Sequence, residues 1–230
     1  MKKTITTFVV LLASTCVAWA ADLQAVEKRM DDAAGVLRQI MNAPDKGIPE
    51  EVVKGAKCIA VIPHEIKGGF VVGGRHGRGV ATCRTASAWS APAFFAITGG
   101  SWGAQIGLEA VDNVLMIMNQ RGMDHLLSNK FTIGADASAA AGPVGRHAAA
   151  GTDWKMDTEI LSYSRAKGAF AGVTLNGAVV RPDNDAMAAM YDGKATVRQV
   201  LLGHVPPPAA ARTFLAAVRE SEAQAKQARK

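Results

Sequence analysis

The sequence predicts an α+β protein: a strongly bent antiparallel sheet or partial barrel, with N- and C-terminal helices packed on it. Six of the twelve residues from Gly68 to Gly79 are glycine, and only short apolar runs of strand length lie between them. Glycine allows a positive φ or a close approach of two backbones, which indicates tightly turned β structure. Strands and helices do not alternate along the chain, so a parallel α/β sheet is not expected.

The first twenty residues have the composition of a secretory signal peptide. Two lysines precede an apolar stretch from Ile5 to Ala18, and Ala18-Trp19-Ala20 matches an A-x-A cleavage site. This stretch is shorter than the roughly 20 apolar residues that a membrane-spanning helix needs. We therefore expect cleavage after Ala20 and export, with a periplasmic or outer-membrane-associated location. Cys16 offers the alternative of a lipidated N terminus, but the residues before it match a lipobox poorly.

The segment from Asp22 to Met41 is predicted to be an amphipathic helix that ends before Pro44. It carries four acidic and three basic residues, whereas membrane-surface helices are rich in Lys and Arg. We therefore expect this helix to pack against the sheet. A second short helix is expected from about Pro49 to Lys57. The apolar residues at helical spacing in the first helix are Leu23, Val26, Met30, Ala33, Ala34, Leu37, Ile40 and Met41.

The central part of the chain is predicted to form strands, interrupted by a short helix at Met123–Leu127. Asn176-Gly177 is the strongest short hairpin signal in the sequence, so the strands on either side of it are expected to pair. The expected strands are Cys58–Ile62, Gly69–Gly73, Gly79–Cys83, Ala93–Thr98, Gln105–Leu108, Asn113–Met118, Lys130–Ile133, Val144–Ala149, Thr158–Tyr163, Ala169–Leu175 and Ala178–Arg181.

The C-terminal part of the chain is expected to be helical. One helix is predicted at Asp185–Tyr191, stopped by Gly193, and another at Val197–Leu202 with Thr196 as its N-cap. The three prolines at 206–208 break the chain before a final helix, Ala209–Arg229.

Composition and charge exclude several classes of function. The net charge of +6, to which the two lysines of the expected signal peptide contribute, is too small and too scattered to indicate nucleic-acid binding. A mild positive balance instead favours anionic surfaces. The five histidines show no ligand spacing, and His64-Glu65 does not continue into an H-E-x-x-H motif. We therefore expect no metal, no cofactor and no nucleic-acid partner.

Two cysteines, Cys58 and Cys83, remain after the expected cleavage. An oxidising compartment permits a disulfide between them. The alternative is two buried free thiols, because cysteine is among the most buried residue types. They lie in two different predicted strands of one meander, and the sequence leaves both alternatives open.

The segment Gly99–Gly103 matches G-x-S-x-G, the nucleophile elbow of serine hydrolases, with Ser101 as the nucleophile. The elbow requires a helix directly after the serine. Here Gly103, Gly107 and the alternating residues between them predict another strand. We therefore expect no enzyme, and a hydrolase that uses Ser101 is the catalytic alternative.

The run from Gly74 to Gly79 carries two arginines, Arg75 and Arg78, and a histidine. It matches neither a Walker A loop nor G-x-G-x-x-G before a helix, which argues against a nucleotide site. It is predicted to be a hairpin tip, either a solvated basic turn or a site where arginine binds phosphate.

The order of several segments is similar to the SYLF (Ysc84-type) domain, a lipid-binding family. The resemblance covers Ile48 to Val205 and divides the chain into a signal peptide (1–20), an N-terminal helix (21–47), the SYLF-like domain (48–205) and a C-terminal helix after the proline break (206–230). The similar segments are AKCIAVIP, GGFVVGGRHGRG, WSAP, GGSWGAQIG, GADASAAAGPVGR and SYSRAKGAFAGVTLNG.

The resemblance implies a non-catalytic module of the cell envelope that binds lipid. Eukaryotic members of the family are associated with phosphoinositides and fungal members with actin. For an exported chain the implied partner is an anionic phospholipid or membrane surface. The basic residues implied to meet headgroup phosphate are Lys67, Arg75, Arg78 and Arg146. The alternative is a structural module that binds another envelope protein.

Overall fold

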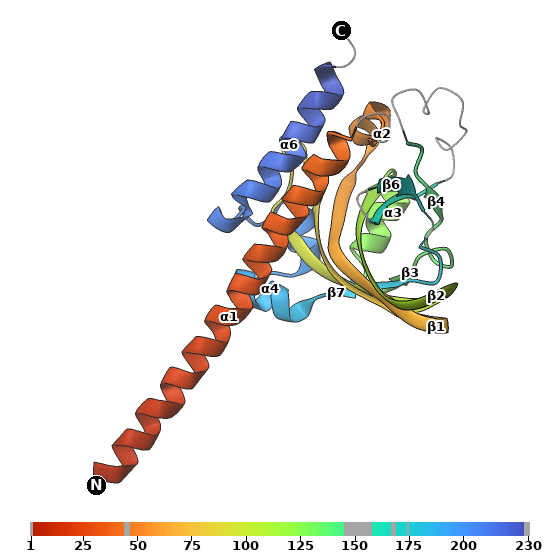
Figure 1. Cartoon of the computed structure of the whole chain (residues 1–230). Helices are drawn as coiled ribbons and strands as arrows, with labels where there is room; N and C mark the ends of the chain where they lie inside the picture. Colours follow the sequence, from red (N-terminus) through yellow and green to blue (C-terminus); the bar gives the residue numbers. More distant parts are fainter. Residues whose placement is uncertain (1, 44–46, 145–157, 167–168, 174, 228–230) are drawn as a thin grey trace.

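The computed structural model describes residues 2–43, 47–144, 158–166, 169–173 and 175–227. The protein is α+β, with helices around a strongly curled, half-barrel sheet (Figure 1). The helices are α1 (Lys2–Met41), α2 (Glu50–Gly55), α3 (Gln120–Leu126), α4 (Asn184–Tyr191), α5 (Val197–Leu201) and α6 (Arg212–Gln227), the last preceded by a 3₁₀ turn at Ala209–Ala211. The strands are β1 (Cys58–Cys83), β2 (Ala93–Ile117), β3 (Phe131–Thr132), β4 (Ala139–Ala141), β5 (Ile160–Ala166), β6 (Ala169–Gly172) and β7 (Val179–Pro182).

A long antiparallel ribbon, formed by β1 and β2, is the centre of the sheet. The two strands pair along almost their whole length, from Cys58 opposite Ile117 to Ala81 opposite Ala93. The other edge of β2 pairs with β7 along its first half and with β5 along its second. The predicted antiparallel arrangement is wrong at one place, because β4 runs parallel to β5. The sheet is therefore mixed.

The ribbon is folded back on itself, so that the two arms of β1 lie against each other. A Cβ atom on Gly77 would lie 2.6 Å from Cγ2 of Ile62, and one on Gly79 would lie 2.8 Å from the carbonyl oxygen of Val61. Only glycine permits such an approach. The pairing register shifts between Gly69 and Val71, which marks the irregular part of the ribbon between the two arms.

A disulfide joins the two ends of β1. Cys58 and Cys83 are bonded, and their Cα atoms lie 4.0 Å apart. The predicted meander is therefore wrong in its connectivity, because the two cysteines lie at opposite ends of one folded strand and not in separate strands.

Two sequence predictions about turns are wrong. The residues 74–79 form no hairpin tip, because they pair with 95–100 inside the ribbon. The strands on either side of Asn176-Gly177 do not pair with each other: β6 pairs with β5, and β7 pairs with β2 and β3. Gly177 does adopt a positive φ of 80°, but its N–H donates to the carbonyl of Ile133 instead of closing a hairpin. The predicted strand Val144–Ala149 lies almost entirely outside the described residues.

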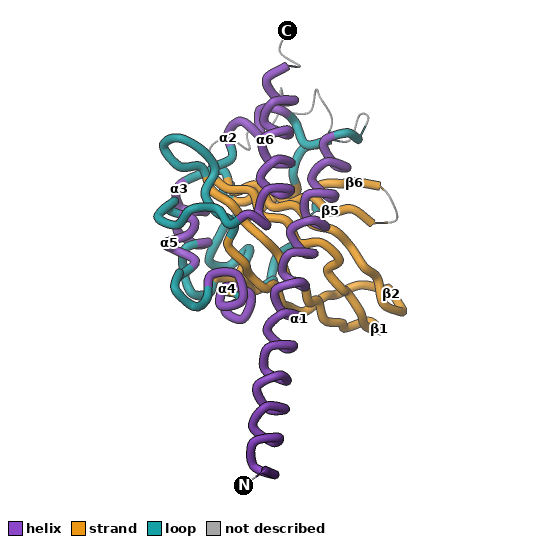
Figure 2. Tube along the Cα trace, turned by 90° about the vertical axis from the view of Figure 1, so that its left-hand side faces the viewer, coloured by secondary structure: helices purple, strands orange, loops and turns teal. Residues whose placement is uncertain are grey.

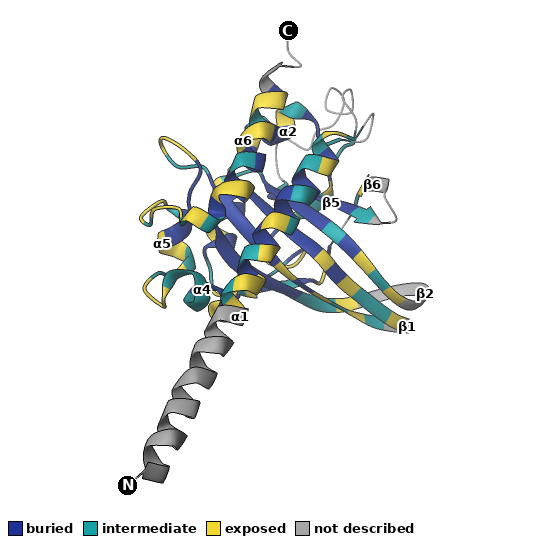
Figure 3. Cartoon of the chain, turned by 60° about the vertical axis from the view of Figure 1, so that its left-hand side comes forward, coloured by how far each residue is buried: buried dark blue, intermediate teal, exposed yellow. Residues whose placement is uncertain are grey.

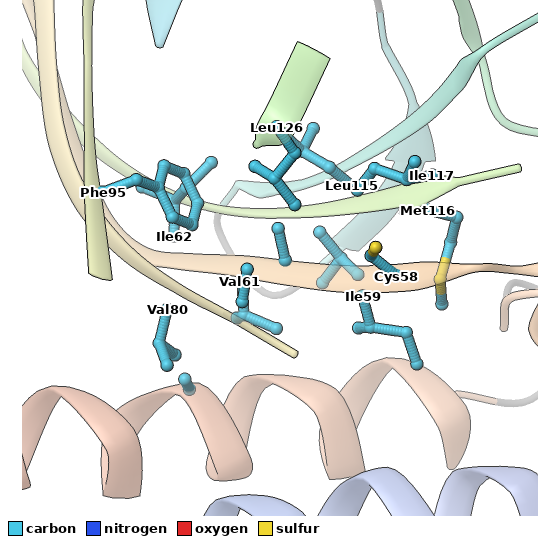
Figure 4. Packing of buried hydrophobic residues seen from close by; sticks show 14 of the residues in the cluster. Cys58, Ile59, Val61, Ile62, Val80, Phe95, Leu115, Met116, Ile117 and Leu126 are labelled. Carbon is cyan, nitrogen blue, oxygen red and sulfur yellow. The ribbon is translucent and has the colours of Figure 1, made fainter. Parts of the chain in front are cut away.

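Helices α1 and α6 cover the convex face of the sheet. Figure 2 shows α1 and α6 lying across the strands, and Figure 3 shows buried residues on these helices and on the strands that they cross. In Figure 4, Ile59, Val61 and Val80 point toward these helices, whereas Ile62 and Leu115 point to the opposite, concave side. The apolar face predicted for the first helix is buried here, including Met30 and Leu37 at 0% exposure. Apolar side chains on both faces thus stabilise the curled sheet.

A buried ion pair fastens α1 to α4. Arg29 donates from Nη1 to Oδ2 of Asp183 over 2.9 Å, and the two side chains are only 8% and 7% exposed. Asp183 also caps α4, because its Oδ1 accepts the backbone N–H of Ala186. Burial lowers the pKa of Arg29, and the carboxylate of Asp183 opposes this shift.

A second polar contact joins α2, the end of β1 and α6. Arg84 donates to the carbonyl oxygens of Ala56 and Val53 and to the carboxylate of Glu222. Its guanidinium also stacks over the ring of Trp89, 4.4 Å from the centroid. The W-S-A-P segment of the sequence therefore closes the end of the ribbon against the C-terminal helix.

Candidate functional site

The structure separates the basic residues implied by the family resemblance. Lys67 and Arg75 lie on different arms of β1, on the concave face of the ribbon, where each is partly buried. Arg78 lies on the convex face, because side chains alternate along a strand. Its Nε lies 3.8 Å from Oδ2 of Asp183, and its side chain is exposed. Arg146 lies outside the described residues. Only Lys67 and Arg75 are brought together.

A buried polar cluster accompanies these two cations. Glu65 is fully buried and accepts a hydrogen bond at Oε2 from Nδ2 of Asn113, also fully buried. The Nε atom of Arg75 lies 3.6 Å from Oε1 of Glu65. Glu65 and Arg75 come from the two arms of β1, so their pairing depends on the fold of the ribbon. We call Glu65, Lys67, Arg75 and Asn113 the inner cluster.

Burial perturbs the ionisation of the inner cluster. It raises the pKa of Glu65, and the charges of Arg75 and Lys67, the hydrogen bond from Asn113 and the charge of His76 oppose this shift. Burial also lowers the pKa of Lys67, against the attraction of Glu65 and Glu109. Both shifts favour the neutral form, because a charge loses hydration when it leaves water.

A bulge explains why Glu65 faces inward. The register of the ribbon changes between Ile62 and Glu65, where Pro63 and His64 on β1 stand opposite a single residue of β2. His64 has a φ of 53°, and its backbone N–H donates to Oδ1 of Asp112 over 2.9 Å. Simple alternation from Ile62 would place Glu65 on the convex face, so sequence reasoning missed this residue.

Two large apolar side chains are exposed on the other face of the same part of the ribbon. Among the side chains that the structure describes, Ile66 is 52% and Leu108 is 84% exposed. Ile66 pairs opposite Ala110 and Leu108 opposite Gly68, which places both side chains on the convex face. We call residues 66–75 and 99–110 the ribbon end. Figures 1 and 3 show that this part of β1 and β2 projects beyond the helices.

The sequence of the ribbon end holds further apolar residues, Phe70-Val71-Val72 on β1 and Trp102 on β2. Their backbone belongs to the two strands, and their side chains lie outside the description. Sequence reasoning interpreted Phe70-Val71-Val72 as part of a strand and Trp102 as a core or rim anchor.

Ser101 does not lie in a nucleophile elbow. It pairs opposite Gly73 in the middle of β2, and the strand continues to Ile117. A strand-to-helix turn directly after the serine is therefore not formed. Within the described parts of the chain, no group of three His, Cys, Asp or Glu side chains is arranged to hold a metal ion. In the same parts, no helix combines the length and apolar character needed to cross a membrane.

The fold and the site define an α+β half-barrel whose central ribbon presents an apolar end and an inner cluster of charges. Residues 98–221 match a protein family, Ysc84, described as "Las17-binding protein actin regulator". An SH3 domain-containing protein of Schizosaccharomyces pombe is 38% identical over 178 residues, which cover 76% of this chain and 41% of that protein. The chain belongs to the Ysc84 (SYLF) family.

Other relatives agree with this assignment. LAS seventeen-binding protein 3 of Saccharomyces cerevisiae is 34% identical over 170 residues, covering 72% of this chain and 37% of the yeast protein. The human SH3 domain-containing YSC84-like protein 1 is 31% identical over 186 residues, covering 78% of this chain and 54% of the human protein. The chain thus spans about two fifths to one half of the length of these relatives.

Proposed function

We propose that this chain is a non-catalytic, lipid-binding module of the cell envelope that attaches to anionic phospholipid membranes through the ribbon end. One observation carries the proposal: Ile66 and Leu108 are exposed on a part of the ribbon that projects beyond the helices. Exposed apolar side chains on a projecting element are typical of surfaces that bind membranes or proteins. Lys67 follows Ile66 on the same strand, with its side chain on the concave face. It favours the membrane, because a long side chain can reach a phosphate group from a partly buried position.

The expected energies are sufficient for reversible attachment. Full withdrawal of a Leu or Ile side chain from water contributes about 1.5–3 kcal/mol. A Lys or Arg near an anionic membrane surface contributes about 1 kcal/mol. Two apolar side chains and one or two cations therefore support binding that weakens as salt screens the electrostatic part. Export through the N-terminal segment, which is part of this proposal, would bring the chain to the envelope phospholipids.

Removing the exposed apolar side chains tests the proposal. We expect the double variant Ile66→Thr/Leu108→Thr to bind anionic vesicles at least about tenfold more weakly, because it loses most of the transfer free energy of two side chains. Threonine suits an exposed strand and leaves the net charge unchanged. Co-sedimentation with phosphatidylcholine vesicles, with and without phosphatidylglycerol, measures the affinity at low and high salt.

Val205→Thr is the matched control, because it removes a partly buried apolar side chain in the loop after α5, outside the ribbon. Its affinity should equal that of the unmodified chain. Absence of binding by the unmodified chain to anionic vesicles would overturn the lipid proposal. Unchanged binding by the double variant would instead remove the ribbon end from the site.

The names of the relatives support a second candidate, a protein-binding module. The family description and LAS seventeen-binding protein 3 both refer to the binding of a protein. The same exposed ribbon end would then be a protein interface. Cross-linking in intact envelopes would distinguish the two, because a protein interface yields one reproducible partner through residues near Leu108, without dependence on lipid.

A further inference from the structure

We infer that Arg75 is an anion-binding residue whose guanidinium is paired with the Glu65 carboxylate in this structure. Loss of the Glu65 charge makes Arg75 available to the phosphate of an anionic lipid. This inference rests on the proposed function. It adds to that function the side chain that recognises the lipid headgroup, and the carboxylate that competes with the headgroup for this side chain.

Arg75 has unused hydrogen-bonding capacity. Its Nε and Nη1 atoms are buried and have no hydrogen-bond partner. Its contact with Glu65 is 3.6 Å long, whereas a charge-assisted hydrogen bond from nitrogen to carboxylate is about 2.7–2.9 Å. Buried guanidinium donors are normally satisfied. The long contact therefore leaves these two donors unsatisfied, and phosphate, like carboxylate, matches the geometry of the guanidinium.

Glu65 is the group that prevents this binding. Its Oε2 atom accepts from Asn113, and its Oε1 atom has no hydrogen bond and faces Arg75. While Glu65 is charged, a phosphate at Arg75 would be repelled by a carboxylate within a few ångströms. Once Glu65 is neutral, Arg75 keeps its charge and loses its competitor.

The surroundings of Glu65 favour an anion after this change. The charged and titratable groups whose electrostatic effect reaches it are Arg75, Lys67 and His76 on β1, and Asn113 on β2 is its neutral partner. Glu109 on β2 stands opposite Lys67 in the pairing register. With Glu65 protonated, the two cations Arg75 and Lys67 exceed the single remaining carboxylate. Ile66 lies between Glu65 and Lys67 in the sequence, with its side chain on the opposite, convex face of the same part of the ribbon end.

The direction of the pH dependence follows from the burial of Glu65. Because its pKa is raised, Glu65 takes up a proton at higher pH than an ordinary glutamate. Its carboxylate persists above that pKa and is lost as the pH falls through it. Anionic lipid should therefore be bound more tightly on acidification.

Substitution of Glu65 by glutamine tests the inference, since Glu65→Gln removes the charge and keeps the shape. The unmodified chain should bind vesicles containing about one third phosphatidylglycerol roughly fivefold more tightly near pH 5.5 than near pH 7.5, the effect of about 1 kcal/mol for one cation at an anionic surface. Glu65→Gln should bind near pH 7.5 as the unmodified chain binds near pH 5.5. The affinity of this variant should change by less than about threefold between the two pH values.

Two controls separate this effect from net charge and from histidine. Asp185→Asn, at an exposed position on α4, changes the net charge equally and should leave the affinity and the pH profile unchanged. His76→Asn removes the neighbouring imidazole and should keep the pH dependence. Adding Arg75→Gln to Glu65→Gln should abolish the gain in affinity. Thermal melting verifies that each variant is folded. The pH profile of the unmodified chain tests the inference without any substitution.

The outcomes are distinguishable. A flat pH profile of the unmodified chain, or Glu65→Gln binding as the unmodified chain does, would overturn the inference while leaving the proposed function intact. Absence of binding by the unmodified chain at both pH values would overturn the proposed function instead. Persistence of vesicle binding by Glu65→Gln in excess inorganic phosphate supports the lipid headgroup as ligand. Displacement by inorganic phosphate at equal affinity would assign the site to free phosphate and overturn the headgroup assignment.

Discussion

Replacing Asp183 with asparagine is expected to lower the free energy of unfolding by about 3 kcal/mol, because it leaves the buried Arg29 without a counter-charge. Breaking a buried ion pair on one side typically costs about 3–5 kcal/mol, since the remaining charge stays desolvated. Asparagine is a good N-cap and keeps the bond to Ala186, so this variant isolates the effect of the charge. Asp183→Ala should cost about 1 kcal/mol more, because it also removes the cap.

Urea unfolding followed by circular dichroism measures these changes. The matched control is Lys28→Ala, which breaks an exposed ion pair with Asp32 on the same helix and should change stability by less than about 0.5 kcal/mol. Arg29→Met combined with Asp183→Asn should restore much of the stability, because an apolar side chain replaces the unpaired charge. A loss in Asp183→Asn no larger than in Lys28→Ala would show that the buried pair does not hold α1 against α4.

Removing the Cys58–Cys83 disulfide is expected to have the second large effect. The bond closes a chain segment with a sequence separation of 25 residues. The loop-entropy relation gives a stabilisation of about 3–4 kcal/mol for a loop of this length. Cys58→Ala/Cys83→Ala should therefore unfold at a much lower urea concentration than the oxidised chain. The two arms of β1 would also lose the covalent bond that holds their ends together.

Reduction of the unmodified chain provides an independent comparison. Reductant should shift its unfolding midpoint toward that of the double-alanine variant and should leave the midpoint of that variant unchanged. Mass spectrometry after alkylation verifies the state of the thiols. Equal stability of the oxidised chain and the double variant would show that the packing of the folded ribbon suffices without the bond.

The helices could be predicted well from the sequence because their signals are local. Thr196 forms the predicted N-cap of α5, with a full capping box to Gln199, and α1 ends at Met41, before Pro44. Gly193, the predicted stop of α4, adopts a positive φ of 68° directly after the C-cap residue. In each case the residue acts on neighbours within one turn, so no tertiary contact was needed to interpret it.

The strands were harder to predict than the helices, because glycine occurs both in turns and where two backbones approach closely. The sequence predicted turns at the glycines of 68–79, but Gly77 and Gly79 lie within a paired strand, where they permit the arms of β1 to touch. A turn and a close backbone approach require the same residue. Asn176-Gly177 failed as a hairpin signal for a related reason, since Gly177 has the expected positive φ but the neighbouring strands have other partners. Long-range strand pairing decides whether a glycine lies in a turn or inside a paired strand.

The candidate site could be predicted only in part. The cations Lys67 and Arg75 were recognisable from residue type, but their proximity depends on the fold of the ribbon. Glu65 was hidden by the bulge at Pro63–His64, which changes the phase of the strand. Leu108 was predicted only as the end of a strand, and the projection of the ribbon beyond the helices leaves it exposed.

The central position of β2 determines how small an autonomously folding piece of this protein can be. The family match begins at residue 98, which is within β2 and after all of β1. A fragment cut there would leave the edge of β2 that pairs with β1 as a row of unpaired backbone groups, a template for aggregation. It would also separate Asp183 from Arg29. A fragment that keeps every backbone ladder and this ion pair must begin within α1, before Arg29, and end after Asp183. The start of the family match is therefore a poor guide to truncation.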